Sequence, residues 1–315
     1  MATEEITAGR IEAWEIDARR NPLARVFRGL LYFVRRKPLG TFGGVLLFIP
    51  VFFAIFGPSF DVGPVHWPGF LPYEYREYQI GQDTLRGPSG GHIMGTDHLG
   101  RDLFSRIVFG ARLSLGIGFG VFAISTLLST SLTLVCGYYV RTVDLILQRV
   151  IELISFLPDL ILLVALFSIY GAKPLTLILT LGVLTGLTTV RVLRAVVIGI
   201  RALPYIEAAK SLGASDFRII TRHILPNVMY LIIIGSTQAL AIFVTIEAGL
   251  AILGISVNPT YPTLGNLLNA SRNYLRVAPY LAIFPGLVLF MILLGSRLLG
   301  DALRDVLDPR LRGSR

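Results

Sequence analysis

The most informative stretch of this chain is YIEAAKSLGASDFRIITRHILPN, residues 205–227. It predicts a short helix, because Pro204 suits a first helical turn and the run Glu207–Lys210 favours helix. Gly213 is typical of the residue that ends a helix. Three small side chains would let another surface approach this helix closely: Ala208, Ala209 and Ala214.

Long apolar runs lie on both sides of this stretch. Hydrophobic residues make up 53% of the 315 residues and charged residues only 16%, and the mean hydropathy is +0.67. A soluble domain usually carries about 25% charged residues. Crossing a bilayer takes about 20 mostly apolar residues. We therefore expect an all-α, polytopic membrane protein with six transmembrane helices, at roughly 39–60, 113–140, 153–170, 175–190, 228–254 and 279–299.

Basic residues mark one side of these runs. Lys and Arg gather before the first run, between the second and third, between the fourth and fifth, and after the sixth. The positive-inside rule places those connectors and both termini in the cytoplasm. The net charge of +9 is therefore explained by bilayer orientation and contact with membrane lipids rather than by nucleic acid. Three arginines do not follow the rule, because the six-helix arrangement places them outside the cell: Arg101, Arg106 and Arg112.

The apolar runs and the connectors divide the chain into expected parts. A cytoplasmic amphipathic segment comes first, then the first transmembrane helix, an extracytoplasmic segment leading into the second helix, a five-helix core and a cytoplasmic tail. The core contains a cytoplasmic loop at about 199–227. The parts in order are 1–38, 39–60, 61–112, 113–300 and 301–315.

The loop at 205–227 resembles the cytoplasmic signature loop of ABC importer membrane subunits. That pattern is Glu-Ala-Ala, three residues, Gly, nine residues, an aliphatic residue, one residue and Leu-Pro. Only His223 departs from it, in the place of the aliphatic residue, while Leu225 and Pro226 fill the last two positions. In the family this loop is a coupling helix that docks into a groove on the ATPase. The resemblance assigns coupling to Glu207, Ala208, Ala209, Lys210, Ser211, Gly213 and Ala214.

A second stretch, residues 94–115, narrows the resemblance. It is similar to the segment before the second span in C-type permeases of dipeptide, oligopeptide and nickel importers, and residues 298–310 resemble the end of the same proteins. Physically, Asp102 suits the cap of a helix, and we interpret the Asp and Arg residues as fixing a loop rather than contacting a ligand. The extracytoplasmic motif comprises Gly95, Thr96, Asp97, Gly100, Arg101 and Asp102.

Glu247 is the ionisable residue placed deepest in an expected span. Such residues are functional candidates by default. Glu247 either lines the pathway or forms a hydrogen bond between helices, and its small neighbours favour the second role. We predict no metal site, because His66, His92 and His98 match no metal-binding spacing.

The chain contains no Gly-x-x-x-x-Gly-Lys-Ser/Thr sequence, so it lacks the usual phosphate cradle for ATP. We therefore expect no enzyme activity and no cofactor in this chain. The resemblance implies a plasma-membrane subunit, in a bacterium or archaeon, that translocates di- or oligopeptides by alternating access. Its implied partners are a homologous B-type permease, two ATP-binding subunits that hold ATP and Mg, and an extracytoplasmic binding protein.

Two alternatives stay open at this point. The first is an ABC importer for nickel or another small solute. The second is an ATP-independent secondary transporter, a class that predicts charges deep in several spans and often inverted repeats. The sequence shows one clear deep charge and no repeat.

Overall fold

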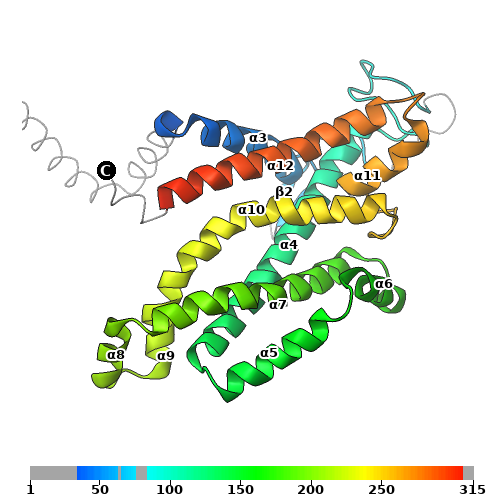
Figure 1. Ribbon diagram of the computed structural model, residues 1–315. Coiled ribbons are helices and arrows are strands. Elements are labelled where there is room, and N and C mark those ends of the chain that lie inside the picture. Colours follow the sequence, from blue (N-terminus) through cyan, green and yellow to red (C-terminus); the bar gives the residue numbers. More distant parts are fainter. Residues whose placement is uncertain (1–33, 63–64, 76–83, 308–315) are drawn as a thin grey trace, which may run out of the picture.

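The computed structural model describes residues 34–62, 65–75 and 84–307. The predictions for 1–33 and 308–315 lie outside these residues. The expected all-α fold is confirmed, apart from a small antiparallel hairpin in which β1 (Phe60–Val62) pairs with β2 (Val65–Trp67) (Figure 1). The helical elements in chain order are α3 (Pro38–Phe56), α4 (Leu103–Tyr138), α5 (Thr142–Ser155), α6 (Asp159–Tyr170), α7 (Pro174–Arg201), α8 (Pro204–Ser211), α9 (Asp216–Ile219), the π-helix η1 (Ile220–Ile224), α10 (Leu225–Ile252), α11 (Leu264–Ser271), the 3-10 helix η2 (Arg272–Tyr274) and α12 (Tyr280–Leu307).

Several helices are suited to a bilayer. Within the described residues, α3, α4, α7 and α12 are each long and apolar enough to cross a membrane. α10 is a continuous helix of 28 residues. At about 1.5 Å per residue it is about 42 Å long, more than the roughly 30 Å of a hydrocarbon core. The chain is therefore a multi-pass membrane protein.

The third span, expected at roughly 153–170, is not one continuous helix. α5 and α6 meet at an angle of 79° and form at most one bent span. Pro158 lies at the break, where the residue before a proline is disfavoured in helical geometry. α6 has only 12 residues, about 18 Å, and cannot cross a bilayer alone. α5 is tied to α7 by a two-pronged ion pair between Asp144 and Arg194.

Two predicted boundaries also shift. α3 ends at Phe56 rather than at residue 60, because Pro58, which follows the capping residue Gly57, has no N–H to continue the helical hydrogen bonds. α12 continues to Leu307 and so runs into the part of the chain predicted to be a tail from residue 301.

The first and last described helices, α3 and α12, pack closely through glycine. A Cβ atom added to Gly43 would lie 2.5 Å from the Leu298 Cβ, and one added to Gly295 would lie 2.8 Å from the Gly43 carbonyl oxygen. Small residues permit this approach between membrane helices. Beyond the contact, the Lys37 Nζ lies 2.6 Å from the Asp305 Oδ2. The start of α3 and the end of α12 therefore lie together.

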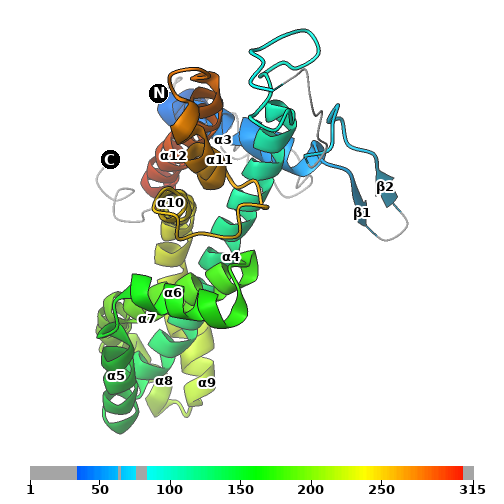
Figure 2. The same cartoon turned by 90° about the vertical axis from the view of Figure 1, so that its right-hand side faces the viewer.

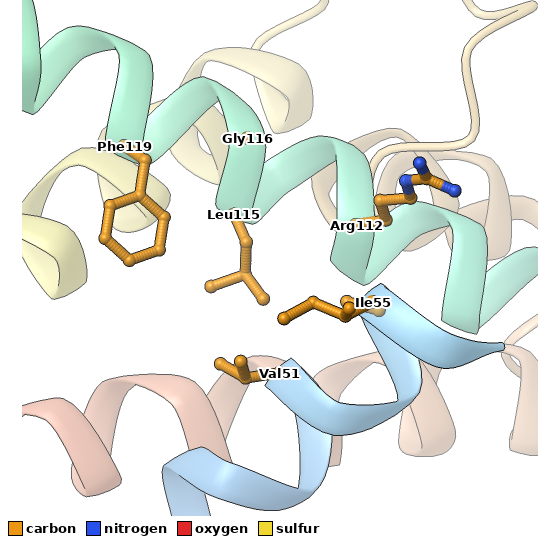
Figure 3. Close-up of a pocket in the computed structure, with 7 residues that line it drawn as sticks. Val51, Ile55, Arg112, Leu115, Gly116 and Phe119 are labelled. Carbon is orange, nitrogen blue, oxygen red and sulfur yellow. The ribbon is translucent and has the colours of Figure 1, made fainter. Parts of the chain in front are cut away.

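An apolar pocket of about 300 Å³ separates part of α3 from α4. In Figure 3 the side chains of Val51 and Ile55 face Leu115 across this gap, whereas the guanidinium of Arg112 points away from it. The pocket therefore presents mainly hydrocarbon surface, and we do not place the functional site there.

The two motif regions lie at opposite ends of the helices. In Figure 1, α8 and α9 lie at the lower left, while α11 and the loop before α4 lie at the upper right. Figure 2 shows the same separation, with α8 and α9 at the bottom and α11 near the top. The long helices run between these ends, so the two motifs lie at opposite ends of the helical bundle.

Candidate functional site

The predicted short helix is α8, Pro204–Ser211, with its proline in the first turn. It ends at Gly213, whose φ is +81°. The Gly213 N–H donates to the Lys210 carbonyl at 2.9 Å, and the Ala214 N–H donates to the Ala209 carbonyl at 3.1 Å. This pair of bonds is the Schellman motif, in which a left-handed residue satisfies the last carbonyls of a helix. Local sequence therefore accounts for both ends of α8.

Ile206 holds α8 on the membrane helices. Its side chain is 1% exposed and lies in an apolar cluster with residues of α4, α7, α9, η1 and α10. Burial of a large aliphatic side chain is worth about 1.5–3 kcal/mol. The buried members of the cluster are Tyr138, Val197, Ile206, Ile219, Ile224 and Val228. α8 therefore shares one apolar cluster with three long helices, α4, α7 and α10.

Asp216 forms a second anchor, which the sequence reasoning missed. Its Oδ1 accepts a hydrogen bond from the Tyr138 hydroxyl at 2.5 Å, and its Oδ2 accepts one from the Tyr139 hydroxyl at 3.2 Å. The bond from Tyr138 is the main reason that the pKa of Asp216 lies below its usual value. The Lys210 Nζ lies 5.1 Å from the centre of the Tyr138 ring. In the sequence, the only sign of this anchor is the pair Tyr138 and Tyr139 at the end of an apolar run. Buried tyrosine hydroxyls usually need a hydrogen-bond partner.

The Leu-Pro end of the motif shapes the start of α10. Pro226 has no N–H to donate to the preceding turn, and the chain adopts a wider π turn in which the Leu225 N–H reaches the Ile220 carbonyl. The Asn227 Nδ2 donates to the His223 carbonyl at 2.6 Å. This hydrogen bond involves only the backbone carbonyl of His223, so it does not depend on which side chain stands at this position. A histidine in place of the aliphatic residue of the family pattern is therefore compatible with it.

The outward surface of α8 is free of the membrane helices. Glu207 and Ala208 are exposed. Two large apolar side chains beside them are unusually exposed, Leu212 at 88% and Phe217 at 76%. Exposed apolar groups gathered in this way mark an interaction surface. α8 is thus anchored on one face and open to a partner on the other.

The extracytoplasmic motif folds as one hydrogen-bonded loop around Asp97. The Asp97 Oδ1 accepts the N–H groups of Leu99 at 2.8 Å and Arg101 at 3.0 Å, and its Oδ2 accepts the Arg101 Nε at 2.7 Å. Gly100 has a φ of +73°, which a residue with a side chain adopts at a cost.

The rest of the motif fixes the start of α4. Asp102 caps the helix by accepting the Ser105 N–H at 2.8 Å, and its other oxygen lies 2.9 Å from the His92 Nδ1. The Thr96 hydroxyl oxygen accepts the Arg86 N–H at 3.0 Å. A Cβ on Gly95 would lie 2.5 Å from the Arg86 carbonyl oxygen. All six motif residues therefore belong to one loop, as expected of a loop-fixing element.

Glu247 is completely buried where α10 meets α4 and α11. Its Oε2 accepts a hydrogen bond from the Ser114 hydroxyl at 3.0 Å, and the Ser114 oxygen in turn accepts the Leu264 N–H at 3.0 Å. The Ser256 hydroxyl lies 3.5 Å from the Glu247 Oε1. This geometry is that of a polar contact between helices.

Comparison with known proteins gives the family. Residues 129–313, more than half of the chain, match the family described as binding-protein-dependent transport system inner membrane component. The chain belongs to this family. As a member it is a permease subunit of an ABC importer, a transport component rather than an enzyme. Membership implies partner ATPase and substrate-binding proteins.

Curated relatives cover most of this permease. It is 35% identical over 247 residues to the glutathione transport system permease protein GsiD of Pectobacterium atrosepticum, covering 78% of this chain and 82% of the relative. It is 36% identical over 230 residues to the dipeptide transport system permease protein DppC of Alkalihalophilus pseudofirmus, covering 73% and 76%. It is 33% identical over 242 residues to GsiD of Escherichia coli O157:H7, covering 77% and 80%. These relatives agree with the predicted C-type permease.

Two histidines of the outer region, His92 and His98, each contact another side chain. His92 contacts Asp102, and the His98 ring stacks on Tyr274 with the ring centres 5.1 Å apart. Among the described residues, no three His, Cys, Asp or Glu side chains are grouped so as to hold a metal ion. The side chain of His66 lies outside what the structure describes.

Proposed function

We propose that this permease is one of two homologous transmembrane subunits of an importer that moves di- or oligopeptides into the cell by alternating access. The partner subunit is a B-type permease, and an extracytoplasmic binding protein delivers the peptide. The names of the relatives, which include dipeptide and glutathione permeases, support a peptide substrate. The proposed location is the plasma membrane of a bacterium or archaeon.

The two faces of α8 carry the proposal. Its buried residue Ile206 contacts the cluster formed by α4, α7 and α10, while Glu207, Ala208 and Leu212 are exposed. One of the two ATP-binding subunits, which hold ATP and Mg, binds the exposed face of α8. When these subunits close, α8 moves, and its anchors at Ile206 and Asp216 displace the attached long helices. Such rigid displacement of packed helices is a common way to switch between two states.

The proposed topology places both termini and α8 in the cytoplasm. Its main support is the positive-inside rule. The Lys37–Asp305 ion pair also brings the start of α3 and the end of α12 to one side. The extracytoplasmic motif and α11 then face the binding protein.

The assembled transporter in proteoliposomes tests the coupling role. We expect Glu207→Ala and Gly213→Asp to lower peptide uptake several-fold and to weaken retention of the ATPase. Gly213 makes a sharp test because a Cβ there meets open space, so an aspartate adds charge and backbone strain without a clash. Gly254→Asp is the matched control, because exposed Gly254 also has a positive φ, +78°, and open space around a Cβ, and it lies at the opposite end of α10. Wild-type uptake and ATPase retention in both coupling variants would contradict the proposal.

A further inference from the structure

The bent span α5–α6 is broken at the depth of the membrane, beside the middle of α7. Residues 156–158 are not helical. The Arg191 Nη2 donates a hydrogen bond to the Ser155 hydroxyl oxygen at 3.3 Å, and Leu157 lines the same pocket as Val183. α7 has 28 residues and is about 42 Å long, so its middle lies within a hydrocarbon core of about 30 Å. The break therefore lies at this depth as well.

Charged side chains are exposed around the break. Asp159 and Arg191 are both exposed, and neither forms an ion pair with any residue that the structure describes. Arg149 and Glu152, also on α5, pair with each other at 2.8 Å. Charged groups and non-helical backbone are costly against lipid, and at membrane depth they face protein or a water-filled cavity. This surface of α5, α6 and α7 is therefore unsuited to contact with lipid.

An apolar pocket of about 630 Å³ extends between α6 and α7 from the break. This volume is typical of a site for a small molecule. Leu162 of α6 and Leu184 of α7 line it, and Lys173 lies at its outer end. Asp159 precedes Leu162 by three residues and Arg191 follows Leu184 by seven, and at these spacings residues share one face of a helix. The two unpaired charges therefore flank the inner end of the pocket.

We propose that this pocket is a solute subsite of the permease pathway and that it holds a short zwitterionic peptide. The inference rests on the proposed function, which makes a peptide the solute. The Arg191 guanidinium binds the peptide carboxylate through charge-assisted hydrogen bonds. The Asp159 carboxylate accepts hydrogen bonds from the ammonium end, and the apolar walls contact the peptide's side chains. A lipid tail would leave both charges without a partner.

Cysteine accessibility in the assembled importer tests the location of the subsite. In the Cys136→Ala background, Val183→Cys places a thiol in the pocket wall. Phe290→Cys on α12 is the control, because Phe290 is 58% exposed and lies ten residues after the start of its helix, as Val183 lies nine after the start of α7. Thiols react as thiolates, which form poorly in apolar surroundings.

We expect Val183→Cys to react with a water-soluble thiol reagent, and transport of dialanine to slow that reaction several-fold. We expect Phe290→Cys to stay unreactive. Leu179→Cys, in the same pocket wall, replaces Val183→Cys if that variant assembles poorly.

Paired substitutions test the two charges. Arg191→Gln and Asp159→Asn remove a charge, whereas Arg191→Lys and Asp159→Glu keep it. We expect each neutral variant to slow dialanine uptake about tenfold, the loss expected for one charge-assisted hydrogen bond, and each charge-conserving variant to recover most of the rate. Retention of the ATPase and of the partner permease should be unchanged in all four, which a purely structural role would not give.

An unreactive pocket cysteine would show that lipid or the partner subunit covers the pocket. A reactive cysteine that dialanine does not protect would show that the solute passes elsewhere. Either result, or equal uptake by the neutral and charge-conserving variants, overturns the inference while the proposed function stands. A wild-type importer that moves no dialanine is instead a failure of the proposed function.

Discussion

The Tyr138 hydroxyl donates a hydrogen bond of 2.5 Å to the Oδ1 of Asp216, which lies 78 residues further along the chain. Tyr138 is the last residue of α4, and Asp216 begins α9, just after α8. This bond therefore joins α9, which directly follows the candidate coupling helix α8, to α4, the longest helix among the described residues.

Removing that hydroxyl should weaken coupling without removing the packing of the ring. For Tyr138→Phe we expect less peptide imported per ATP hydrolysed, because α4 no longer follows α8 as closely. Tyr139→Phe should have a smaller effect, since its bond to Asp216 is 3.2 Å long and exposed. The measurement is the ratio of uptake to ATP hydrolysis in proteoliposomes. An unchanged ratio in Tyr138→Phe would show that this bond does not transmit motion.

The same site predicts how coupling depends on cytoplasmic pH. The pKa of Asp216 is lowered, chiefly by the Tyr138 hydrogen bond. The ionised Asp216 side chain therefore stabilises the folded state at every pH above the ordinary aspartate pKa of about 3.9. This stabilisation is lost only as the pH falls through the lower pKa that Asp216 has in the folded protein. We expect Asp216→Asn to reduce the uptake ratio by the same factor from about pH 5.5 to 8. A defect that disappears toward the acid end of this range would contradict the assignment.

Substitutions of two apolar residues in the coupling region should affect different properties, one the stability of the permease and the other the docking of the ATPase. Ile206→Ala removes a buried side chain and should cost about 2–5 kcal/mol of local packing, which a lower unfolding temperature of the purified permease would reveal. Leu212→Ala, at a position 88% exposed, should leave that temperature unchanged and weaken ATPase binding. Equal effects of the two changes on both readouts would refute the division into an anchored face and a docking face.

Glu247 offers a test between a structural and a pathway role. Glu247→Gln keeps an oxygen that accepts the Ser114 hydrogen bond, so we expect near wild-type stability and uptake. Glu247→Leu leaves the buried Ser114 hydroxyl without that acceptor and should cost about 1–3 kcal/mol. Thermal unfolding and peptide uptake are measured on both variants. A stable Glu247→Gln protein that imports nothing would instead assign Glu247 to the pathway.

The topology predicts which positions react from outside. A cysteine at Ser211, in α8, should resist a membrane-impermeant thiol reagent in intact cells, and a cysteine at the exposed Gly90 should react. The native Cys136 is buried, and its Cys136→Ala background supplies the control. Labelling of the Ser211 position from outside would overturn the orientation.

Much of the fold was predictable from consecutive residues. The lengths of the apolar runs predicted a membrane protein. Pro204 and Gly213 predicted the two ends of α8, because the backbone preferences of proline and glycine act over only a few residues. The bend between α5 and α6 was not predicted, although Pro158 was visible. Proline is tolerated within membrane helices, so its presence alone did not decide between a kinked span and a broken one.

The sequence by itself determined that this chain is a polytopic permease with a short helix in its signature loop, because apolar lengths, capping residues and motif spacing are local properties. Only the tertiary structure showed that Asp216 meets Tyr138, that Glu247 meets Ser114, and that Arg101 and Arg106 share Asp97 beside α11. These contacts join different helices and loops. Which polar groups meet depends on how the helices pack, and local backbone preferences do not specify that packing.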